Sequence, residues 1–235
     1  MQRLDKILSE AGVASRKELK GMIRAGRVTV DGAVVRDGAE KFDETACVLT
    51  VDGEAVEKYR KVLLMLHKPA GYVTSTDDPR DRTVMELIPE VYRKFGVMPV
   101  GRLDKDTEGL LLLTNDGDLA HRIISPRHGV WKRYYAEHEG QAADADVQAF
   151  ADGLTLADGL HCLPARLTPL GPGRSVVEVQ EGKYHQVRRM LASRGMPVTY
   201  LRREAEGGLD LGELPLGQTK ELDIVEAERL LLSIL

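Results

Sequence analysis

The stretch Gly101-Arg102-Leu103-Asp104-Lys105-Asp106-Thr107-Glu108-Gly109-Leu110-Leu111-Leu112-Leu113-Thr114-Asn115-Asp116-Gly117 places an arginine and several carboxylates before an unbroken apolar run. An apolar run of this length between turn residues is typical of a buried strand. Leu103 and the four consecutive leucines can anchor the segment and leave Asp104 fixed at the edge of a sheet. A carboxylate there is either the cap of a turn or a positioned reagent, and aspartate is common in turns. The stretch alone leaves both interpretations open.

The composition is that of an ordinary globular protein. The 235 residues are enough for one large domain, or for a small domain followed by a medium one. The net charge of −4 argues against a surface that is basic throughout, although an average can hide a local basic patch. Cys47 and Cys162 lie far apart and outside any CxxC spacing. This pattern excludes a cysteine-rich zinc site and indicates a reducing compartment without a disulfide framework.

Neither a targeting segment nor a cofactor motif is visible. The first residues lack the apolar core of a signal peptide, and no run approaches the roughly 20 apolar residues of a membrane span. We therefore expect a soluble cytoplasmic protein. The histidines His121, His128 and His138 have no metal-ligand spacing such as HExxH, and no dinucleotide-binding motif occurs. We expect no metal and no cofactor.

Residues 3–27 have the hydrophobic period of two short amphipathic helices. Gly12 separates them, and Ser15 with Glu18 forms a capping-box start for the second helix. Strand-like residues 28–30 and 33–35 then flank Asp31-Gly32, which is a favoured turn pair for a hairpin.

This N-terminal segment is locally basic, with Arg3, Lys6, Arg16, Lys17, Lys20, Arg24, Arg27 and Arg36 against Asp5, Glu10, Glu18 and Asp31. Arg16, Lys17, Lys20, Arg24 and Arg27 recur at helical spacing. A charged helical face is usually just solvated, but here it adjoins the hairpin. The segment resembles the RNA-binding module of ribosomal protein S4 type, whose pattern is RLDxxL, SR and GxVxVNG, with Asp31 where asparagine is commoner. The resemblance implies that these five residues grip RNA backbone.

The remaining chain predicts many short strands and few helices. The expected strands are 62–66, 131–138, 167–170 and 175–179. The expected helices are a turn at 84–88, a short helix capped by Asp118, and segments at 141–153 and 186–191, with a closing tail over 226–235. Because strands and helices do not alternate regularly, we expect an α+β fold with a mainly antiparallel sheet. The predicted organisation is a small domain over 1–57, a linker over 58–61, and a second domain over 62–235.

Four segments carry polar groups at the ends of apolar elements: 68–71, 101–109, 132–134 and 182–189. In this order they resemble the RsuA-type pseudouridine synthase family, whose pattern is KPxG, GRLDxDTxGLLLLTNDG, KxY and EGxxHQVRRM. The resemblance implies a mixed, bent central sheet with an RNA cleft across its middle. The intervening segments 75–79, 125–128 and 201–204, the last with Gly207-Gly208, are similar to those of members that act on small-subunit ribosomal RNA.

The resemblance also implies roles for individual residues. Asp104 matches the catalytic aspartate and Tyr134 the active-site tyrosine, whose ring can stack on uracil. An aspartate nucleophile must stay ionised in a closed site, and Arg188 is the candidate for its counter-ion. Arg102, beside the nucleophile, would fill the space that a flipped uridine leaves. Further RNA-backbone contacts are expected from Lys68, Arg127, Lys132 and Arg189.

Three neighbouring residues receive structural interpretations. Asp106 and Glu108 are expected to cap the turn, and His185 to be a hydrogen-bonded scaffold residue rather than a general base. Whether Asp104 attacks the sugar, attacks the base or initiates glycal formation stays open.

The predicted function is therefore the isomerisation of a uridine to pseudouridine in ribosomal RNA, with the small subunit favoured, by a monomer that needs no cofactor. The alternatives are a synthase acting on large-subunit or transfer RNA, and a catalytically silent RNA-binding factor of ribosome assembly.

Overall fold

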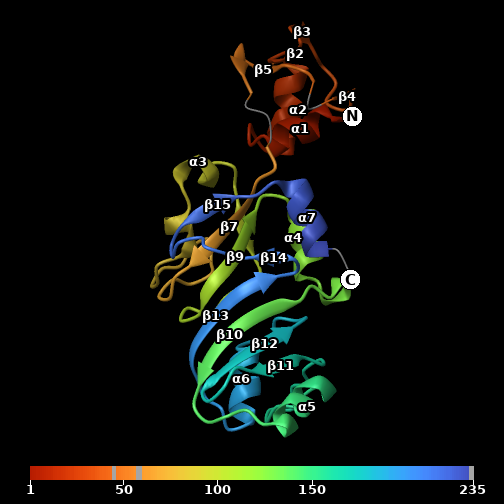
Figure 1. Cartoon of the computed structure of the whole chain (residues 1–235). Helices are drawn as coiled ribbons and strands as arrows, with labels where there is room; N and C mark the ends of the chain where they lie inside the picture. Colours follow the sequence, from red (N-terminus) through yellow and green to blue (C-terminus); the bar gives the residue numbers. More distant parts are fainter. Residues whose placement is uncertain (44–45, 57–59, 233–235) are drawn as a thin grey trace. The chain divides into compact units, whose positions relative to one another are not determined.

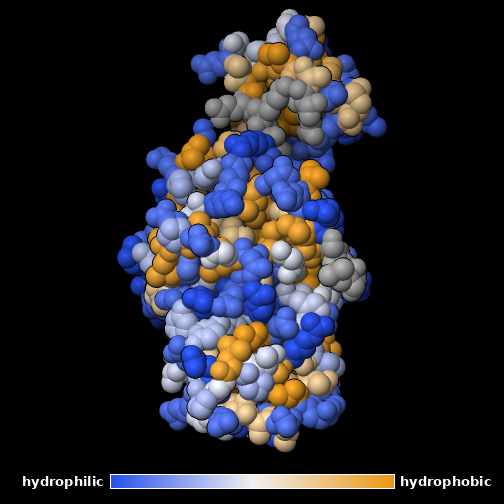
Figure 2. Space-filling model, in the orientation of Figure 1, coloured by the Kyte–Doolittle hydropathy of each residue, from blue (hydrophilic) through white to orange (hydrophobic). Residues whose placement is uncertain are grey.

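The chain folds into two compact units, Met1–Arg60 and Lys61–Leu235 (Figure 1). The structure, a computed structural model, describes residues 1–43, 46–56 and 60–232. Residues 58 and 59 of the predicted linker lie outside the described residues. Each unit has its own hydrophobic core. Most of the face that Figure 2 shows is hydrophilic, and hydrophobic residues form separate patches on it.

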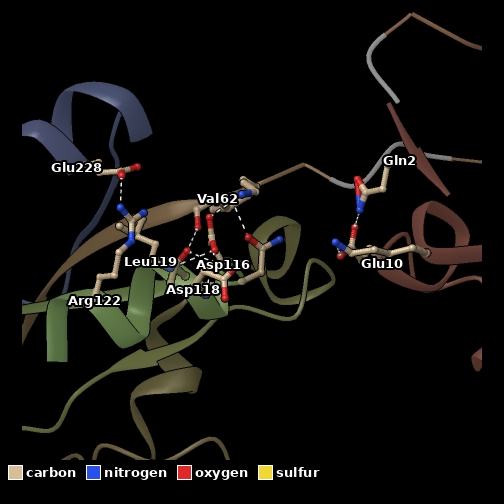
Figure 3. A network of polar contacts seen from close by, with 12 residues as sticks. Gln2, Glu10, Val62, Asp116, Asp118, Leu119, Arg122 and Glu228 are labelled. Carbon is tan, nitrogen blue, oxygen red and sulfur yellow. Dashed lines mark hydrogen bonds and ion pairs between the residues drawn. The ribbon is translucent and has the colours of Figure 1, made fainter. Parts of the chain in front are cut away.

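The first unit packs two helices against short strands. Its elements are β1 (Gln2–Arg3), α1 (Leu4–Glu10), α2 (Arg16–Arg24), β2 (Val28–Val30), β3 (Ala33–Val34), β4 (Lys41–Phe42), β5 (Leu49–Val51) and β6 (Glu54–Ala55). One antiparallel sheet has the order β3-β2-β5-β6, and β1 pairs with β4. Gln2 Nε2 donates to Glu10 Oε2 at 2.6 Å and ties β1 to the end of α1 (Figure 3). Leu4, Leu8, Leu19 and Ile23 from the two helices are almost fully buried.

The local sequence signals of this unit are confirmed. Ser15 caps α2 by accepting from Glu18 N, and the Glu18 carboxylate accepts from Ser15 N in return. Asp31 and Gly32 have φ values of +50° and +82° between antiparallel β2 and β3. Positive φ at both central residues matches the twist of the flanking strands, which is why this pair forms a tight hairpin.

The second unit is built on one large mixed sheet. Its strands are β7 (Leu63–Lys68), β8 (Met98–Val100), β9 (Glu108–Thr114), β10 (Lys132–His138), β11 (Arg166–Pro169), β12 (Arg174–Val179), β13 (Val198–Glu206), β14 (Leu209–Asp210) and β15 (Thr219–Glu221). Its helices are η1 (Val84–Leu87), α3 (Glu90–Arg93), α4 (Gly117–Ile124), η2 (Pro126–His128), α5 (Asp144–Asp152), α6 (Gln186–Ser193) and α7 (Ile224–Leu232).

The sheet order is β11-β12-β10-β13-β9-β7-β15, with β14 on β13 and β8 on β9. β9 and β13 pair in parallel over two residue pairs, and the other pairings among the described strands are antiparallel. Figure 1 shows α4 and α7 beside one part of the sheet, and α5 and α6 at its β11–β12 end. The α+β class and the mixed, mainly antiparallel sheet are therefore confirmed.

The leucine run forms the buried strand that its sequence predicts. Leu111 and Leu113 pack into the core on one face of the sheet, and Leu110 and Leu112 into the core on the other. All four are fully buried. Successive side chains of a strand point to opposite faces, so a strand with layers on both faces is apolar at every position. Because both faces of β9 are covered, its start is held firmly in place.

One predicted helix cap is wrong. Asp116, not Asp118, is the N-cap of α4, and its carboxylate accepts from the backbone N–H groups of Asp118 and Leu119 at 3.1 Å (Figure 3). Asp118 itself lies in the first turn of the helix. Arg122 on α4 pairs with Glu228 on α7.

The C-terminal segment differs from the expected tail, because residues up to 232 form α7. Ala227 and Leu231 of this helix pack into the same core as α4. Residues 233–235 lie outside the described part of the chain. No helix within the described residues is long and apolar enough to cross a membrane.

Candidate active site

The loop before β9 carries Asp104, and the side chains of Thr74 and Lys68 bind its backbone. Thr74 Oγ1 donates to Leu103 O at 2.8 Å and accepts from Leu103 N at 3.1 Å. The Lys68 ammonium, at the end of β7, donates to backbone carbonyl oxygens at 2.9 to 3.3 Å, those of Pro69, Asp104, Lys105 and Thr107. These bonds define the backbone of the loop on both sides of Asp104.

The expected RNA contact of Lys68 is therefore wrong for this structure. Its side chain is fully buried, and its ammonium is directed at the loop carbonyls rather than at the surface. Burial lowers the pKa of Lys68 from 10.5 to about 8, and the nearby carboxylates of Asp106, Asp104 and Glu108 oppose this shift. Lys68 positions the loop.

The Asp104 carboxylate lies in a pocket lined by residues from the loop, from strands β10, β12 and β13, and from the start of α6, among them Arg102, Asp104, Tyr134, His185, Arg188 and Leu201. Its side chain is 29% exposed, so solvent and a substrate can reach it. Asp104 Oδ2 lies 4.0 Å from Arg188 Nε, and Oδ1 lies 3.6 Å from His185 Nε2. The fold thus brings the predicted nucleophile, tyrosine and counter-ion into one pocket.

Arg188 is shared between two carboxylates. Its Nη2 lies 3.0 Å from Asp106 Oδ2 and 3.4 Å from Thr107 Oγ1, closer than its Nε lies to Asp104. Arg188 Nε is buried and has no hydrogen-bond partner among the described residues. The guanidinium therefore keeps one buried donor directed toward the Asp104 side of the pocket.

The structural roles expected for Asp106 and Glu108 take a different form. Asp106 pairs with Arg188, and Glu108 accepts a hydrogen bond from Tyr200 OH at 2.7 Å. Burial, reinforced by this bond, raises the pKa of Tyr200 to about 12. Both carboxylates thus attach the loop to other elements rather than capping its turn.

Tyr134 lies on β10 with 8% of its surface exposed. Burial raises the pKa of its phenol, so the hydroxyl is neutral at physiological pH and can donate a hydrogen bond. Behind it lie fully buried Arg203 and nearly buried Glu206, whose Oε2 is 3.4 Å from Arg203 Nη2. Arg203 Nε donates to Leu110 O at 2.7 Å, which links the tyrosine's surroundings to β9.

His185 is not the hydrogen-bonded scaffold residue that the sequence suggested. It precedes α6 with φ +49°, in the left-handed region. Its ring faces the Asp104 carboxylate on one side and stacks on Tyr184, with ring centroids 3.8 Å apart and planes at 18°. The left-handed backbone that aims the ring had no sequence signal, because glycine is the usual residue there.

The remaining predicted RNA contacts of this unit divide into exposed and buried groups. Arg102 and Arg127 are exposed, and Arg189 is partly exposed and paired with Asp158. The expected contact of Lys132 is wrong for this structure, because its side chain is buried. Lys132 Nζ donates to Val130 O at 3.1 Å and lies 3.6 Å from Glu206 Oε1.

In the first unit all five predicted RNA-binding residues are exposed, namely Arg16, Lys17, Lys20, Arg24 and Arg27. Arg16, Lys20 and Arg24 line one depression together with Arg3, Arg36 and the two carboxylates of Asp5 and Asp37, so cations outnumber anions there. Arg27 differs because Asp52 in the neighbouring turn already pairs with its guanidinium. The depression has the charge and exposure of an anion-binding surface.

Comparison with known proteins gives a consistent result. The family described as RNA pseudouridylate synthase matches residues 62–193, and the S4 domain matches residues 2–45. An uncharacterized RNA pseudouridine synthase of Bacillus subtilis is 40% identical over 225 residues, covering 94% of both chains. Ribosomal small subunit pseudouridine synthase A of Escherichia coli K12 is 39% identical over 222 residues, covering 94% of this chain and 96% of the relative.

A solved structure of a pseudouridylate synthase superposes with a TM-score of 0.69 at 32% identity, covering 98% of this chain and all of the other. The similarity therefore extends over both units and includes the segments that build the Asp104 pocket. The chain belongs to the RNA pseudouridylate synthase family, in its RsuA-type branch with an S4 domain, and is a pseudouridine synthase.

Proposed function

We propose that this enzyme converts one uridine of small-subunit (16S) ribosomal RNA to pseudouridine, with Asp104 as the nucleophile. The observation that carries the proposal is the pocket in which Asp104, Tyr134 and Arg188 meet. The choice of substrate is supported by the relatives named ribosomal small subunit pseudouridine synthase A, in Escherichia coli and Yersinia pestis, at 39% and 40% identity.

The chemistry requires a nucleophile rather than a redox group. In the overall reaction the bond between N1 of uracil and C1′ of ribose breaks, and a bond from C5 to C1′ forms. C5 loses a proton and N1 gains one, so the reaction is redox-neutral. A carboxylate can attack an electrophilic carbon of the nucleotide and leave again. Asp104 suits this role because it is partly exposed and its Oδ2 lies 4.0 Å from the Arg188 guanidinium.

The remaining residues of the pocket would hold the nucleotide. A uridine within folded RNA is reached only after it leaves its stack, at a cost of a few kcal/mol. The pocket offers the Tyr134 ring for stacking and the Leu201 side chain as an apolar wall. Exposed Arg102, at the pocket and two residues before Asp104, is placed to occupy the vacated stack or to contact phosphates.

In this proposal residues 1–57 dock on RNA and residues 62–235 perform the reaction. The basic depression around Arg16, Lys20 and Arg24 supplies backbone contacts, which fix position but read little sequence. The enzyme would act as a cytoplasmic monomer on ribosomal RNA or a pre-ribosomal particle.

The test is to map pseudouridine in ribosomal RNA from cells that lack the protein, with the wild-type gene or the Asp104→Asn gene restored. We expect one site in small-subunit RNA to disappear, to return with the wild type, and to stay absent with Asp104→Asn. The variant should fold and bind RNA normally, because asparagine keeps the shape of the side chain. Full modification by Asp104→Asn would overturn the nucleophile assignment.

The same map separates the alternatives. If the lost site lies in large-subunit RNA, or in transfer RNA sequenced in parallel, the substrate assignment changes to that RNA and the proposed reaction stays the same. An unchanged map in all three RNA classes, with altered ribosome assembly, would favour the catalytically silent factor.

A further inference from the structure

Tyr184 is an exposed aromatic ring beside the reacting carboxylate that the proposed mechanism does not use. Its exposed fraction is 76%, and it is the one tyrosine among the large hydrophobic residues that are exposed in the described part of the chain. One face of its ring lies flat on His185, with centroids 3.8 Å apart. His185 Nε2 in turn lies 3.6 Å from Asp104 Oδ1. His185 thus lies between the Asp104 carboxylate and the Tyr184 ring.

The segment that carries the ring is held rigidly. Gln186, which is 4% exposed, accepts from Lys183 N at 3.0 Å and donates to Glu181 Oε1 at 2.8 Å. Glu181 Oε1 also accepts from Leu163 N at 2.9 Å. This buried network fixes the residues on both sides of Tyr184, so placing a ligand on its ring requires little ordering of the chain.

The surroundings favour a nucleic-acid base as the ligand. Every nucleobase has a flat face, and base–aromatic stacking tolerates any sequence. The two cations nearest in the chain are already paired: Arg189 donates to Tyr184 O at 3.5 Å and pairs with Asp158, and Lys183 Nζ lies 2.8 Å from Glu181 Oε2. The exposed flat ring, supported by His185 at the edge of the Asp104 pocket, therefore favours a base rather than a phosphate as its ligand.

We propose that Tyr184 is a stacking platform for an unpaired base adjacent to the target uridine, with His185 as its support. The proposal rests on the RNA substrate proposed above. Flipping the uridine separates its neighbours, and a neighbouring base that stacks on Tyr184 regains part of the lost stacking energy. The platform would hold the RNA strand open while the uridine occupies the Asp104 pocket, and it would select targets whose neighbouring base is unpaired.

Fluorescence tests the stacking without requiring catalysis. Trp131 is the only tryptophan, so Trp131→Phe with Tyr184→Trp gives a single reporter at the platform. Titration with oligoadenylate and with small-subunit RNA transcripts should quench this tryptophan. The matched control is Trp131→Phe with Tyr135→Trp, because Tyr135 points to the opposite face of the sheet from Tyr134. Equal signals from both reporters, at RNA concentrations where filter binding shows a complex, would overturn the proposal.

Kinetic measurements distinguish two roles of Tyr184: stacking on an RNA base, and only holding the His185 ring in place. On a short hairpin containing the mapped target uridine, Tyr184→Ala should lower kcat/KM by roughly tenfold to a hundredfold, and Tyr184→Phe should stay near wild type. Removing the neighbouring base (an abasic nucleotide) should slow the wild type by a similar factor. The same removal should change Tyr184→Ala little, because the interaction is already lost.

If the abasic change slows Tyr184→Ala as much as the wild type, the platform is wrong while the synthase activity stands. If Asp104→Asn remains active, the nucleophile assignment fails, and the fluorescence result still decides the platform. If only a protein partner of the ribosomal particle quenches the reporter, the ring serves a protein contact and the base-stacking proposal falls.

Discussion

Asp104 and Asp106 compete for the guanidinium of Arg188. Arg188 Nη2 is 3.0 Å from Asp106, whereas its Nε is 4.0 Å from Asp104. Asp106 is 69% exposed, so water screens its pairing, whereas Asp104 is 29% exposed. The closer contact is therefore the more strongly screened one, and Arg188 lies near both the loop carboxylate and the carboxylate in the pocket.

Substitutions at Arg188 should separate these two functions. Arg188→Met should lower kcat by roughly a hundredfold or more, because it removes the cation beside Asp104. Arg188→Lys should recover only part of this loss, since one ammonium cannot stand both where Nη2 contacts Asp106 and Thr107 and where Nε lies toward Asp104. Asp106→Asn should lose far less, as it keeps the cation in place. Single-turnover assays measure these effects, and an Asp106→Asn defect as large as that of Arg188→Met would contradict this division.

Lys68 predicts a pH dependence. With a pKa of about 8, its ammonium loses a proton as pH rises through 8, and the neutral amine has fewer donors for the loop carbonyls. We expect kcat/KM to fall reversibly as the pH of the assay is raised above 8. Lys68→Met should be poorly active at every pH.

The same titration should not unfold the protein. Since the folded pKa of about 8 lies below 10.5, the ordinary pKa of a lysine, the unfolded chain binds this proton more tightly between those values. Linkage then makes the free energy of unfolding rise with pH in this window as far as Lys68 contributes. A fall in activity that coincides with thermal unfolding would contradict a local effect on the loop.

At the scale of elements, the approach of β9 to β13 creates the site. Their short parallel pairing places Gly109 against Arg203, and a Cβ at Gly109 would lie 2.1 Å from Arg203 O. Gly109 also has φ +112°, which side chains rarely adopt. Only glycine allows the strand that follows the Asp104 loop to lie this close to the strand beside Tyr134.

Gly109→Ala should therefore destabilise the second unit by about 3 kcal/mol or more and reduce activity. Gly117→Ala is the matched control, because a Cβ there meets no atom of the described residues within 4 Å, apart from its chain neighbours and its own helix. Denaturant unfolding of both variants measures the difference. Similar free energies of unfolding for the two variants would show that the β9–β13 pairing accommodates the added methyl group.

The cap of α4 gives a second prediction at this scale. Asp116→Ala should cost about 1 kcal/mol or more, because it removes an N-cap that binds two backbone N–H groups and pairs with Lys61. Although burial opposes it, hydrogen bonding from Lys61 and Leu119 holds the pKa of Asp116 below its usual value. Asp118→Ala should be much milder, and a larger loss there in urea unfolding would restore the cap expected from sequence.

At the scale of the whole molecule, the chain forms two units with separate cores. The Lys61–Leu235 unit contains two hydrophobic clusters, one on each face of its sheet. It should fold without the first unit. Because the basic depression lies in Met1–Arg60, RNA affinity and its salt dependence should reside largely there.

Neutralising that depression tests the division. The variant Arg16→Gln, Lys20→Gln, Arg24→Gln should weaken RNA binding and reduce the slope of log affinity against log salt by roughly two to three. Arg27→Gln is the control, since Asp52 already pairs with this residue. Removing residues 1–57 should weaken binding and broaden target choice while the synthase unit stays folded. Native pre-ribosomal RNA modified equally well by the truncated enzyme would contradict a docking role.

Local patterns predicted the elements because they depend on neighbouring residues. The capping box at Ser15, the Asp31-Gly32 hairpin and the leucine strand each follow from spacing, turn chemistry or apolar content over a few positions. The family motifs also identified the residues that meet in the pocket. The prediction of Asp118 as the cap failed because it depends on where the helix starts, by a margin of one or two residues.

What the amino-acid sequence determined on its own was the locally encoded elements, such as the α2 capping box, the Asp31-Gly32 hairpin and the leucine strand, and the segments that build the pocket. Only the tertiary structure decided which partner each charged group takes. It buried Lys68 under carbonyls that lie up to 39 positions away, paired Arg188 with Asp106, and turned His185 toward Asp104. Such pairings depend on the β9–β13 approach and on the burial of each group, and both arise only when distant segments pack together.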